Sequence, residues 1–263
     1  MKDPRVALTV AGSDSGGGAG IQADLQAFAA FGCHGASVVT ALTAQGPAGV
    51  RGIEVVSDAF VRAQLDAVTA DLPVHAIKTG MLPAADAARA VVELASARGI
   101  PLVVDPVMIA TTGDRLVDDA TIETLETALF PAATLLTPNL PEASFLLGRP
   151  LTSTDLERAC EELADRYRCA VLMKGGDDVG EVVRDCLVDS GGRIVWEHQR
   201  LFPGEGVHGT GCTLAAAVAA GLAWGRTLRE AVEDARAFVH AAIERSVVLG
   251  PGSRLLRWPR AEG

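Results

Sequence analysis

Six consecutive residues, His208 to Thr213, bring glycine, hydroxyl and thiol groups together just before a run that predicts a buried helix. They read His-Gly-Thr-Gly-Cys-Thr, and the alanine-rich run after them spans Leu214 to Ala223. A helix start carries unpaired N–H groups and partial positive charge, and glycines at 209 and 211 let an anion approach the backbone. The pattern favours a site for a phosphate, or for the charge that develops during phosphoryl transfer. A plain helix cap is the alternative that this segment alone leaves open.

The thiol of Cys212 lies close to the start of that helix. A helix N-terminus stabilises a thiolate, so the sequence predicts a lowered pKa for this thiol. A thiolate there could act as a base toward a substrate hydroxyl.

Three further segments supply charged or amide groups suited to nucleotide phosphates and their metal ion. Asn139 and Glu142 are three residues apart at a predicted helix start, a spacing that suits a hydrated Mg²⁺ but equally suits a helix cap. Asp105 ends an apolar strand, where a carboxylate is costly without a partner, so it could assist a magnesium ion or pair with Lys174. Lys174 ends another apolar strand and could reach a transferring phosphoryl group, or lie solvated at the strand end.

Two other segments could contact a small ligand. Gln45 follows a predicted strand, and its amide offers donors and an acceptor to a heterocycle, although a turn glutamine is the simpler alternative. The glycine-rich stretch 12–20 opens a helix with Ile21, Leu25 and Phe28 on its apolar face. It lacks the Walker A lysine and the Rossmann glycine spacing, so we expect either a flexible rim around a ligand or an ordinary turn.

Strand-like runs alternate with amphipathic helical patterns along the chain, which predicts an α/β fold with a mostly parallel sheet covered on both faces. The strand-like runs are Val6–Val10, Ser37–Leu42, Ala76–Thr79, Leu102–Asp105, Thr134–Thr137, Ala170–Lys174, Cys186–Val188 and Ile194–Glu197. The helical patterns are Ala59–Ala70, Ala84–Ala97, Asp118–Leu129, Ser153–Arg168 and Leu228–Val248. No repeat or linker divides the chain, so residues 1–263 are expected to form one domain. Ligands of such sheets bind beyond the carboxyl ends of the strands, where the polar residues above converge.

Composition excludes several classes of function. The 263 residues carry a formal net charge of -10 without a basic run, so nucleic acid and anionic membranes are not expected as partners. The apolar runs are too short for a signal peptide or a membrane span. Five cysteines without a C-x-x-C pair argue against zinc and a disulfide framework, which favours the cytoplasm.

Read together, the motifs resemble those of the hydroxymethylpyrimidine/phosphomethylpyrimidine kinases of thiamine biosynthesis, in the ribokinase-like superfamily. The resemblance extends over roughly residues 5–250 and implies a ribokinase-like three-layer α/β/α fold. The motifs, in chain order, are Ala11-Gly-Ser-Asp…Gly-Gly-Ala-Gly-Ile-Gln-Ala-Asp-Leu25, Thr40-Ala-Leu-Thr-Ala-Gln45, Lys78-Thr-Gly-Met-Leu82, Val104-Asp-Pro-Val-Met108, Thr137-Pro-Asn-Leu-Pro-Glu-Ala143, Leu172-Met-Lys-Gly-Gly176 and His208-Gly-Thr-Gly-Cys-Thr213.

The resemblance implies transfer of the ATP γ-phosphoryl group to 4-amino-5-hydroxymethyl-2-methylpyrimidine, and a second transfer onto the resulting monophosphate. It implies that Gln45 binds the pyrimidine edge, that Met81 and Val107 pack near the ring, and that Gly12 and Asp14 belong to the same pocket. It also implies a homodimer.

For ATP and Mg²⁺, the resemblance assigns the remaining motif residues. Asp105, Asn139 and Glu142 would organise magnesium and its waters, with Asn139 also near the nucleotide. Lys174 would hold the ATP phosphates. The stretch from Gly209 through Thr210 and Gly211 to Cys212 would form an anion hole, with Cys212 in the place of the aspartate base of sugar kinases.

Two segments depart from the family pattern. Many relatives have Lys-Asn-Thr before the His-Gly-Thr-Gly-Cys motif, whereas this chain has Gly204-Glu205-Gly206-Val207, with a negative charge in place of a positive one. Residues 250–257 lack the Gly/His-rich ending of the family, and the sequence assigns them no role.

Two other functions fit the same fold. A pyridoxal kinase shares the hydroxymethyl acceptor on a heteroaromatic ring, and Gln45 with the Met81 and Val107 pair favours the pyrimidine instead. A non-catalytic pyrimidine-binding protein should have lost one of the charged or thiol groups of the site. The chain retains all four of them, namely Asp105, Glu142, Lys174 and Cys212.

Overall fold

A computed structural model describes residues 3–46, 48–108, 116–176, 180–203, 205–250 and 252–259. Within these residues nine strands form one sheet in the order β3-β2-β1-β4-β5-β6-β7-β8-β9, and two further strands pair separately. The strands are β1 (Val6–Asp14), β2 (His34–Gly46), β3 (Gly49–Val55), β4 (Val74–Thr79), β5 (Leu102–Val104), β6 (Leu135–Leu136), β7 (Ala170–Lys174), β8 (Val182–Asp189), β9 (Gly192–Gln199), β10 (Val207–His208) and β11 (Arg254–Leu255).

The central strands run parallel and the edges run antiparallel. Strand β1 pairs in parallel with β2 and β4, and the parallel pairing continues through β5, β6 and β7. Strands β3, β8 and β9 join as antiparallel neighbours at the two edges. The mostly parallel sheet expected from the sequence is therefore confirmed.

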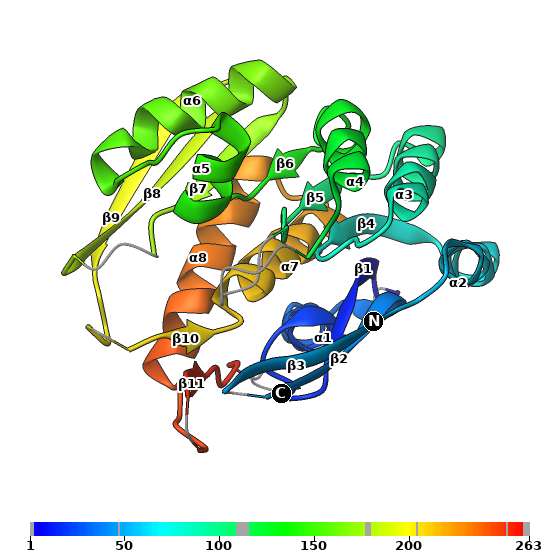
Figure 1. Ribbon diagram of the computed structural model, residues 1–263, viewed down its shortest axis with the longest axis horizontal. Helices are drawn as coiled ribbons and strands as arrows, with labels where there is room; N and C mark the ends of the chain where they lie inside the picture. Colours follow the sequence, from blue (N-terminus) through cyan, green and yellow to red (C-terminus); the bar gives the residue numbers. More distant parts are fainter. Residues whose placement is uncertain are drawn as a thin grey trace.

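Helices cover both faces of the sheet, as Figure 1 shows. One face carries α2 (Asp58–Asp71), α3 (Ala85–Arg98), α4 (Asp119–Thr124), the π-helical turn η1 (Leu125–Leu129), α5 (Leu140–Leu147), the 3-10 turn η2 (Ser153–Asp155) and α6 (Leu156–Tyr167). The other face carries α1 (Gly20–Ala30), α7 (Thr210–Ala223) and α8 (Leu228–Glu244). The three-layer α/β/α arrangement that the resemblance implied is therefore observed.

Small side chains let α7 lie close under the sheet. Of the nine residues from Ala215 to Ala223, eight are alanine, glycine or valine. All eight are buried, and they pack against α1, α8 and the central strands of the sheet. This packing fixes the direction of α7, so its first turn lies at the carboxyl-end edge of the central strands. No helix in the described ranges is long and apolar enough to cross a bilayer.

The structure differs from the sequence prediction at several element bounds. Strand β2 continues to Gly46, four residues beyond the predicted end at Leu42, so Gln45 lies within a strand rather than after one. The added residues pair with β3, which the sequence did not predict because its residues 51–55 are exposed. The helix predicted to end at Val248 ends at Glu244.

Candidate active site

The carboxyl ends of β5 and β7 bring Asp105 and Lys174 together. The Nζ atom of Lys174 donates to Oδ1 of Asp105 at 2.8 Å, and the hydroxyl of Thr137 donates to the same oxygen at 3.2 Å. Both charged side chains are largely buried, with 13% and 3% of their surfaces exposed. The structure therefore shows the Asp105–Lys174 pair that the sequence left open, and Lys174 is not a solvated strand-end lysine.

The pair keeps both groups charged. Burial disfavours the charged forms, but Lys174, Lys78 and the hydrogen bonds outweigh it and leave the pKa of Asp105 below its usual value. For Lys174, burial lowers the pKa, while the carboxylates of Asp105 and Glu142 raise it more, so the ammonium stays protonated. Glu142 therefore lies within electrostatic reach of the same ammonium group.

Helix α7 begins at a glycine in the left-handed conformation. Gly209 is the N-cap with φ 85°, and a side-chain carbon there would overlap the carbonyl oxygen of Gly18. A glycine N-cap has no side chain to accept the N–H groups of the first turn. Gly211 lies in that turn, and a Cβ placed on it would be 3.0 Å from Nζ of Lys174. The helix start and the lysine ammonium thus face the same small space, as the anion-site interpretation requires.

The thiol of Cys212 does not behave as the sequence suggested. Although the residue keeps some exposed surface, burial of the thiol raises its pKa to about 12, with Asp105 and Asp24 adding to the rise. The ammonium of Lys78 and the N–H of Gly20 lower the pKa by less. The predicted thiolate is therefore wrong for this state of the chain, because desolvation and nearby carboxylates outweigh the helix N-terminus.

Asn139 and Glu142 form a capping box at the start of α5. The Oδ1 atom of Asn139 accepts from the N–H of Glu142 at 2.8 Å, and Oε2 of Glu142 accepts from the N–H of Asn139 at 2.9 Å. The helix-cap alternative is thus observed, and it holds the buried Glu142 carboxylate toward the Lys174 side of the site. No group of three metal-binding side chains occurs among the residues that the structure describes.

A fully buried ion pair lies behind the anion site, and the sequence reading missed it. The ammonium of Lys78 on β4 donates to both carboxylate oxygens of Asp24 on α1 at 2.9 Å, and the hydroxyl of Thr9 donates to Asp24 at 2.6 Å. The charged side chains have no exposed surface. One signal was available, because Asp24 falls three residues after Ile21 and four before Phe28 on the apolar face of α1.

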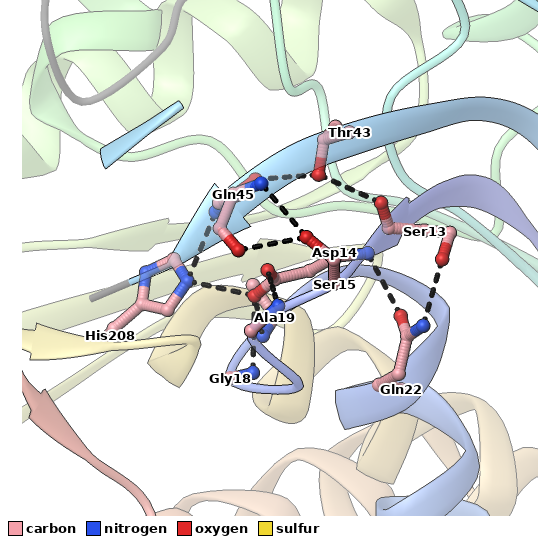
Figure 2. A network of polar contacts seen from close by, with 10 residues as sticks. Ser13, Asp14, Ser15, Gly18, Ala19, Gln22, Thr43, Gln45 and His208 are labelled. Carbon is pink, nitrogen blue, oxygen red and sulfur yellow. Dashed lines mark hydrogen bonds and ion pairs between the residues drawn. The ribbon is translucent and has the colours of Figure 1, made fainter. Parts of the chain in front are cut away.

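The glycine-rich loop after β1 is organised around one carboxylate. Figure 2 shows Oδ2 of Asp14 accepting the N–H groups of Gly18 and Ala19, at 3.1 and 2.8 Å, and the Nε2 atom of His208 lies 3.1 Å from the same oxygen. Gly16 also donates to Asp14, at 2.8 Å. Burial opposes ionisation, but the bonds from His208 and the loop N–H groups outweigh it, so the pKa of Asp14 lies below its usual value.

Gln45 joins the same network from β2. Its Nε2 atom lies 3.2 Å from Nε2 of His208, and its Oε1 accepts from the hydroxyl of Thr43 at 3.2 Å (Figure 2). Its backbone N–H donates to Ser15 at 2.8 Å. His208 therefore links the residue predicted to bind a heterocycle with the strand that leads into the anion site. Sequence reasoning assigned His208 no role beyond its place in the motif.

The other predicted ligand-contacting residues lie along the same edge. A Cβ on the buried Gly12 would be 2.8 Å from Cε of Met81, so the methionine packs directly on the glycine backbone. The hydroxyl of Thr40 holds the Met81 carbonyl at 2.7 Å. Val107 is half-buried in the turn that follows Asp105. The structure thus places every predicted site residue at the carboxyl-end edge of the sheet or directly beside it. Gly204 lies outside the described residues.

A three-layer α/β fold with a glycine-capped helix start and a buried lysine–aspartate pair at the carboxyl-end edge of its sheet is the arrangement of a ribokinase-like small-molecule kinase. The chain matches the family described as "Phosphomethylpyrimidine kinase" over residues 14–257, and it belongs to that family.

The relatives agree with this assignment. A hydroxymethylpyrimidine/phosphomethylpyrimidine kinase of Rhizobium meliloti is 44% identical over 261 residues, which cover 96% of this chain and 98% of the relative. The chain also covers 46% of a probable thiamine biosynthetic bifunctional enzyme of rice, at 44% identity. The chain is therefore a kinase of thiamine biosynthesis.

Solved structures share the fold over nearly the whole chain. A phosphomethylpyrimidine kinase of Clostridium difficile 630 is 38% identical, with a TM-score of 0.77 over 91% of this chain and 99% of that one. An ADP complex of Bacillus subtilis pyridoxal kinase is 34% identical, with a TM-score of 0.89 over 97% and 98%.

Proposed function

We propose that this chain transfers the γ-phosphoryl group of ATP to the hydroxymethyl group of 4-amino-5-hydroxymethyl-2-methylpyrimidine, and then a second phosphoryl group to the monophosphate. The observation that carries the proposal is the convergence of the Lys174 ammonium and the first turn of α7 on one space beside Asp105. Phosphoryl transfer depends mainly on positioning and charge stabilisation, and this arrangement supplies both.

The anion site holds the ATP phosphates. The N–H groups of residues 209–212 point at the transferring group, and Lys174 adds a point charge from β7. Asp105 and Glu142 offer carboxylate oxygens at the same edge, a donor set that fits a hydrated Mg²⁺, with Asn139 fixing Glu142 through the capping box. When bound, the magnesium ion neutralises charge on the phosphate oxygens.

The pyrimidine binds on the other side of the transferred group. Gln45 recognises the ring edge, Met81 and Val107 pack against the ring, and Gly12 leaves room for the Met81 side chain to lie close to the backbone. Asp14 fixes the glycine-rich loop beside it. Support comes from the Met81 contact with Gly12 and from the hydrogen bonds that orient Gln45.

The two transfers differ in their need for a base. In the first, the hydroxymethyl oxygen forms a bond to the γ-phosphorus, the bond from that phosphorus to the β,γ-bridging oxygen breaks, and ADP leaves. The hydroxyl proton passes to Sγ of Cys212 in its thiolate form, which is a minority form at neutral pH because burial raises the pKa of this thiol to about 12. In the second, the acceptor is a phosphate oxygen that is already ionised at neutral pH, so no proton has to be removed.

An assay with Mg²⁺ and ATP and three separate acceptors tests the activity: the pyrimidine alcohol, its monophosphate, and pyridoxal. We expect product from the first two with higher kcat/KM than from pyridoxal. A chain that turns over only pyridoxal would contradict the proposal.

Cys212→Ser tests the role of the thiol in the same assay. Serine keeps a small group in the anion hole but is a far weaker acid than a thiol, so the first transfer should slow much more than the second. Equal losses in both transfers would show that Cys212 acts only as an anion-hole residue.

Pyridoxal phosphorylation is the second candidate activity. The close structural likeness to solved pyridoxal kinases favours it as a side activity, because the fold is shared over nearly the whole chain. Gln45→Ala separates the two acceptors, since loss of the amide should raise KM for the pyrimidine more than KM for pyridoxal.

We also propose that residues 1–263 form one domain and that two copies associate in the cytoplasm. Support for association comes from exposed apolar side chains on β2, β3 and α2, namely Leu42, Ile53, Val55 and Phe60. Light scattering during size-exclusion chromatography should give a dimer mass, and Ile53→Asp with Val55→Asp should give a monomer. The five cysteines are free, as a reducing compartment requires.

A further inference from the structure

The described residues of the two segments that depart from the family pattern lie against each other. Strand β11 near the C-terminus pairs in parallel with β10, with Val207 beside Arg254 and His208 beside Leu255. The N–H of Arg254 donates to the carbonyl of Gly206 at 2.9 Å. Figure 1 shows this short pair next to the start of α7. We call residues 252–259 the C-terminal strap.

The side chain of Arg254 is held on every side. Its Nη1 atom donates to Glu205 at 2.9 Å, its Nε to the hydroxyl of Ser246 at 2.9 Å and its Nη2 to the Ser246 carbonyl at 2.9 Å. The guanidinium carbon lies 3.8 Å from the centre of the Phe202 ring. Only 18% of the Arg254 side chain is exposed, so this charge is fixed in place beside Glu205.

Farther along the strap, Trp258 reaches the first turns of α7. Its indole N–H donates to the hydroxyl of Thr213 at 3.2 Å, and Thr213 is fully buried. The N–H of Thr213 in turn donates to the carbonyl of Gly209 at 3.0 Å. Leu255 packs over the glycine-rich loop, where its Cδ2 is 3.0 Å from the position of a Cβ on Gly18.

The charge of Glu205 gives these contacts a consequence for the reaction. Glu205 precedes by four residues the glycine that begins α7 at position 209, and 52% of its side chain is exposed. Glu205 therefore belongs to the segment that leads into the proposed phosphate site, where a carboxylate without a counter-charge repels a polyanionic nucleotide. Arg254 cancels that charge locally, and the strap joins the segment before the anion site to the helix after it.

We propose that Arg254 and Trp258 are positioning residues for phosphoryl transfer: Arg254 neutralises Glu205 at the entrance for ATP, and Trp258 fixes the first turns of α7 through Thr213. Neither residue touches the reacting atoms. The inference rests on the proposed anion site at residues 209–212, and it gives the strap a role that its sequence did not indicate.

A charge cycle between Glu205 and Arg254 provides the first test, with KM for ATP and kcat measured separately. Arg254→Gln should raise KM for ATP about fivefold, the scale of one partly exposed charge. Adding Glu205→Gln should restore KM, because the charge that needed neutralising is gone. A merely structural arginine would give no such rescue. An unchanged KM in Arg254→Gln, or a double variant as impaired as the single one, would overturn the proposal.

Trp258→Phe provides the second test, because it keeps an aromatic ring and removes the N–H donor. It should lower kcat for both acceptors roughly three- to tenfold, the effect of one lost hydrogen bond to a buried group. Thr213→Val should do the same, and the two changes together should cost little more than either alone. Additive losses would show that the two side chains act independently and would refute this part.

Two further variants keep the outcomes distinct. Arg229→Gln removes a comparable arginine that pairs with Asp189 at 2.6 Å beside the β8–β9 turn, and it should leave both kinetic constants unchanged. Lys174→Met tests the anion site itself. If Lys174→Met leaves transfer intact, the proposed site fails. If Lys174→Met abolishes transfer while the Arg254 and Trp258 variants behave like wild type, only the role of the strap fails.

Discussion

The buried pair between Lys78 and Asp24 makes a sharp energetic prediction. Neither side chain has exposed surface, and the ammonium lies 2.9 Å from both carboxylate oxygens. Asp24→Asn keeps the shape but leaves a buried cation without its counter-charge, which typically costs about 3–5 kcal/mol. The free energy of unfolding of an ordinary domain is about 5–15 kcal/mol, so the variant should lose a large share of its stability.

Lys78→Met leaves the buried Asp24 carboxylate without its cation, and the cost in stability depends on pH. Burial already pushes the pKa of Asp24 upward against Lys78 and Thr9, and removing the ammonium raises that pKa further. When the pKa of a carboxyl group is higher in the folded chain than its unfolded value of about 3.9, the group stabilises the fold at pH values below the unfolded pKa. This stabilisation is lost as the pH rises through the folded pKa. Lys78→Met should therefore be most destabilised at neutral pH and recover as the pH falls toward 5.

Urea unfolding followed by circular dichroism measures these costs in a double-mutant cycle. The double variant should be at least about 2 kcal/mol more stable than the sum of the single losses predicts, because neither charge is then left alone. Arg62→Gln is the control, since its pair with Glu93 at 3.1 Å is half-exposed and should contribute less than about 1 kcal/mol. An Asp24→Asn cost below about 1 kcal/mol, or additive single costs, would refute the reasoning.

The same two variants should move the Cys212 thiol in opposite directions. Its pKa is raised mainly by burial, while Lys78 lowers it and Asp24 raises it. Asp24→Asn should therefore lower the pKa, and Lys78→Met should raise it. The pH dependence of Cys212 alkylation by iodoacetamide, followed by peptide mass spectrometry, reads this directly. Shifts in the same direction in both variants would contradict the electrostatic explanation.

Further predictions follow from the site. With a Cys212 pKa of about 12, the first transfer should rise about tenfold per pH unit between pH 7 and 9, while the second stays flat; a flat first transfer removes the base role. Gly211→Ala should reduce kcat about tenfold or more, because the new Cβ would lie 3.0 Å from Nζ of Lys174. It should not destabilise the helix, since alanine is the better helix former, and a urea titration measured beside the kinetics checks this. The lowered pKa of Asp14 contributes stability that is present above pH 4 and lost below it, so Asp14→Asn should flatten the acid limb of the stability profile.

Most of the sheet could be predicted because buried parallel strands are continuous apolar runs that need no long-range information. Strand β3 (Gly49–Val55) could not, since Arg51, Gly52 and Glu54 interrupt its pattern and its side chains face solvent. Its existence depends on pairing with β2, which in turn carries the strand through Gln45. The missed strand and the misplaced glutamine therefore have one cause.

At the site, residue types were predictable but partners were not. Motif spacing identified Lys174 and Asp105, yet only the structure decides between a solvated lysine and an ion pair across 69 residues of sequence. The state of Cys212 was mispredicted because a helix N-terminus is visible in the sequence, whereas burial and neighbouring carboxylates are not. The role of the strap could not be predicted for the same reason, since it depends on the contact between Arg254 and Glu205, which are far apart in the sequence.

The charge balance at the carboxyl-end edge of the sheet determines which groups attract the triphosphate of ATP. Among the described residues, Lys174 is paired with Asp105 and Lys78 with Asp24, so each of these cations is already matched by a carboxylate. The chain as a whole carries a formal net charge of -10. Attraction for the triphosphate must then come chiefly from the N–H groups at the start of α7 and from the divalent cation that accompanies the nucleotide. Nucleotide affinity measured calorimetrically should accordingly fall far more on removal of Mg²⁺ than on raising NaCl from 50 to 300 mM, because fixed backbone dipoles in a partly buried site are weakly screened. A steep salt dependence with little effect of Mg²⁺ would instead assign the phosphates to exposed side-chain cations.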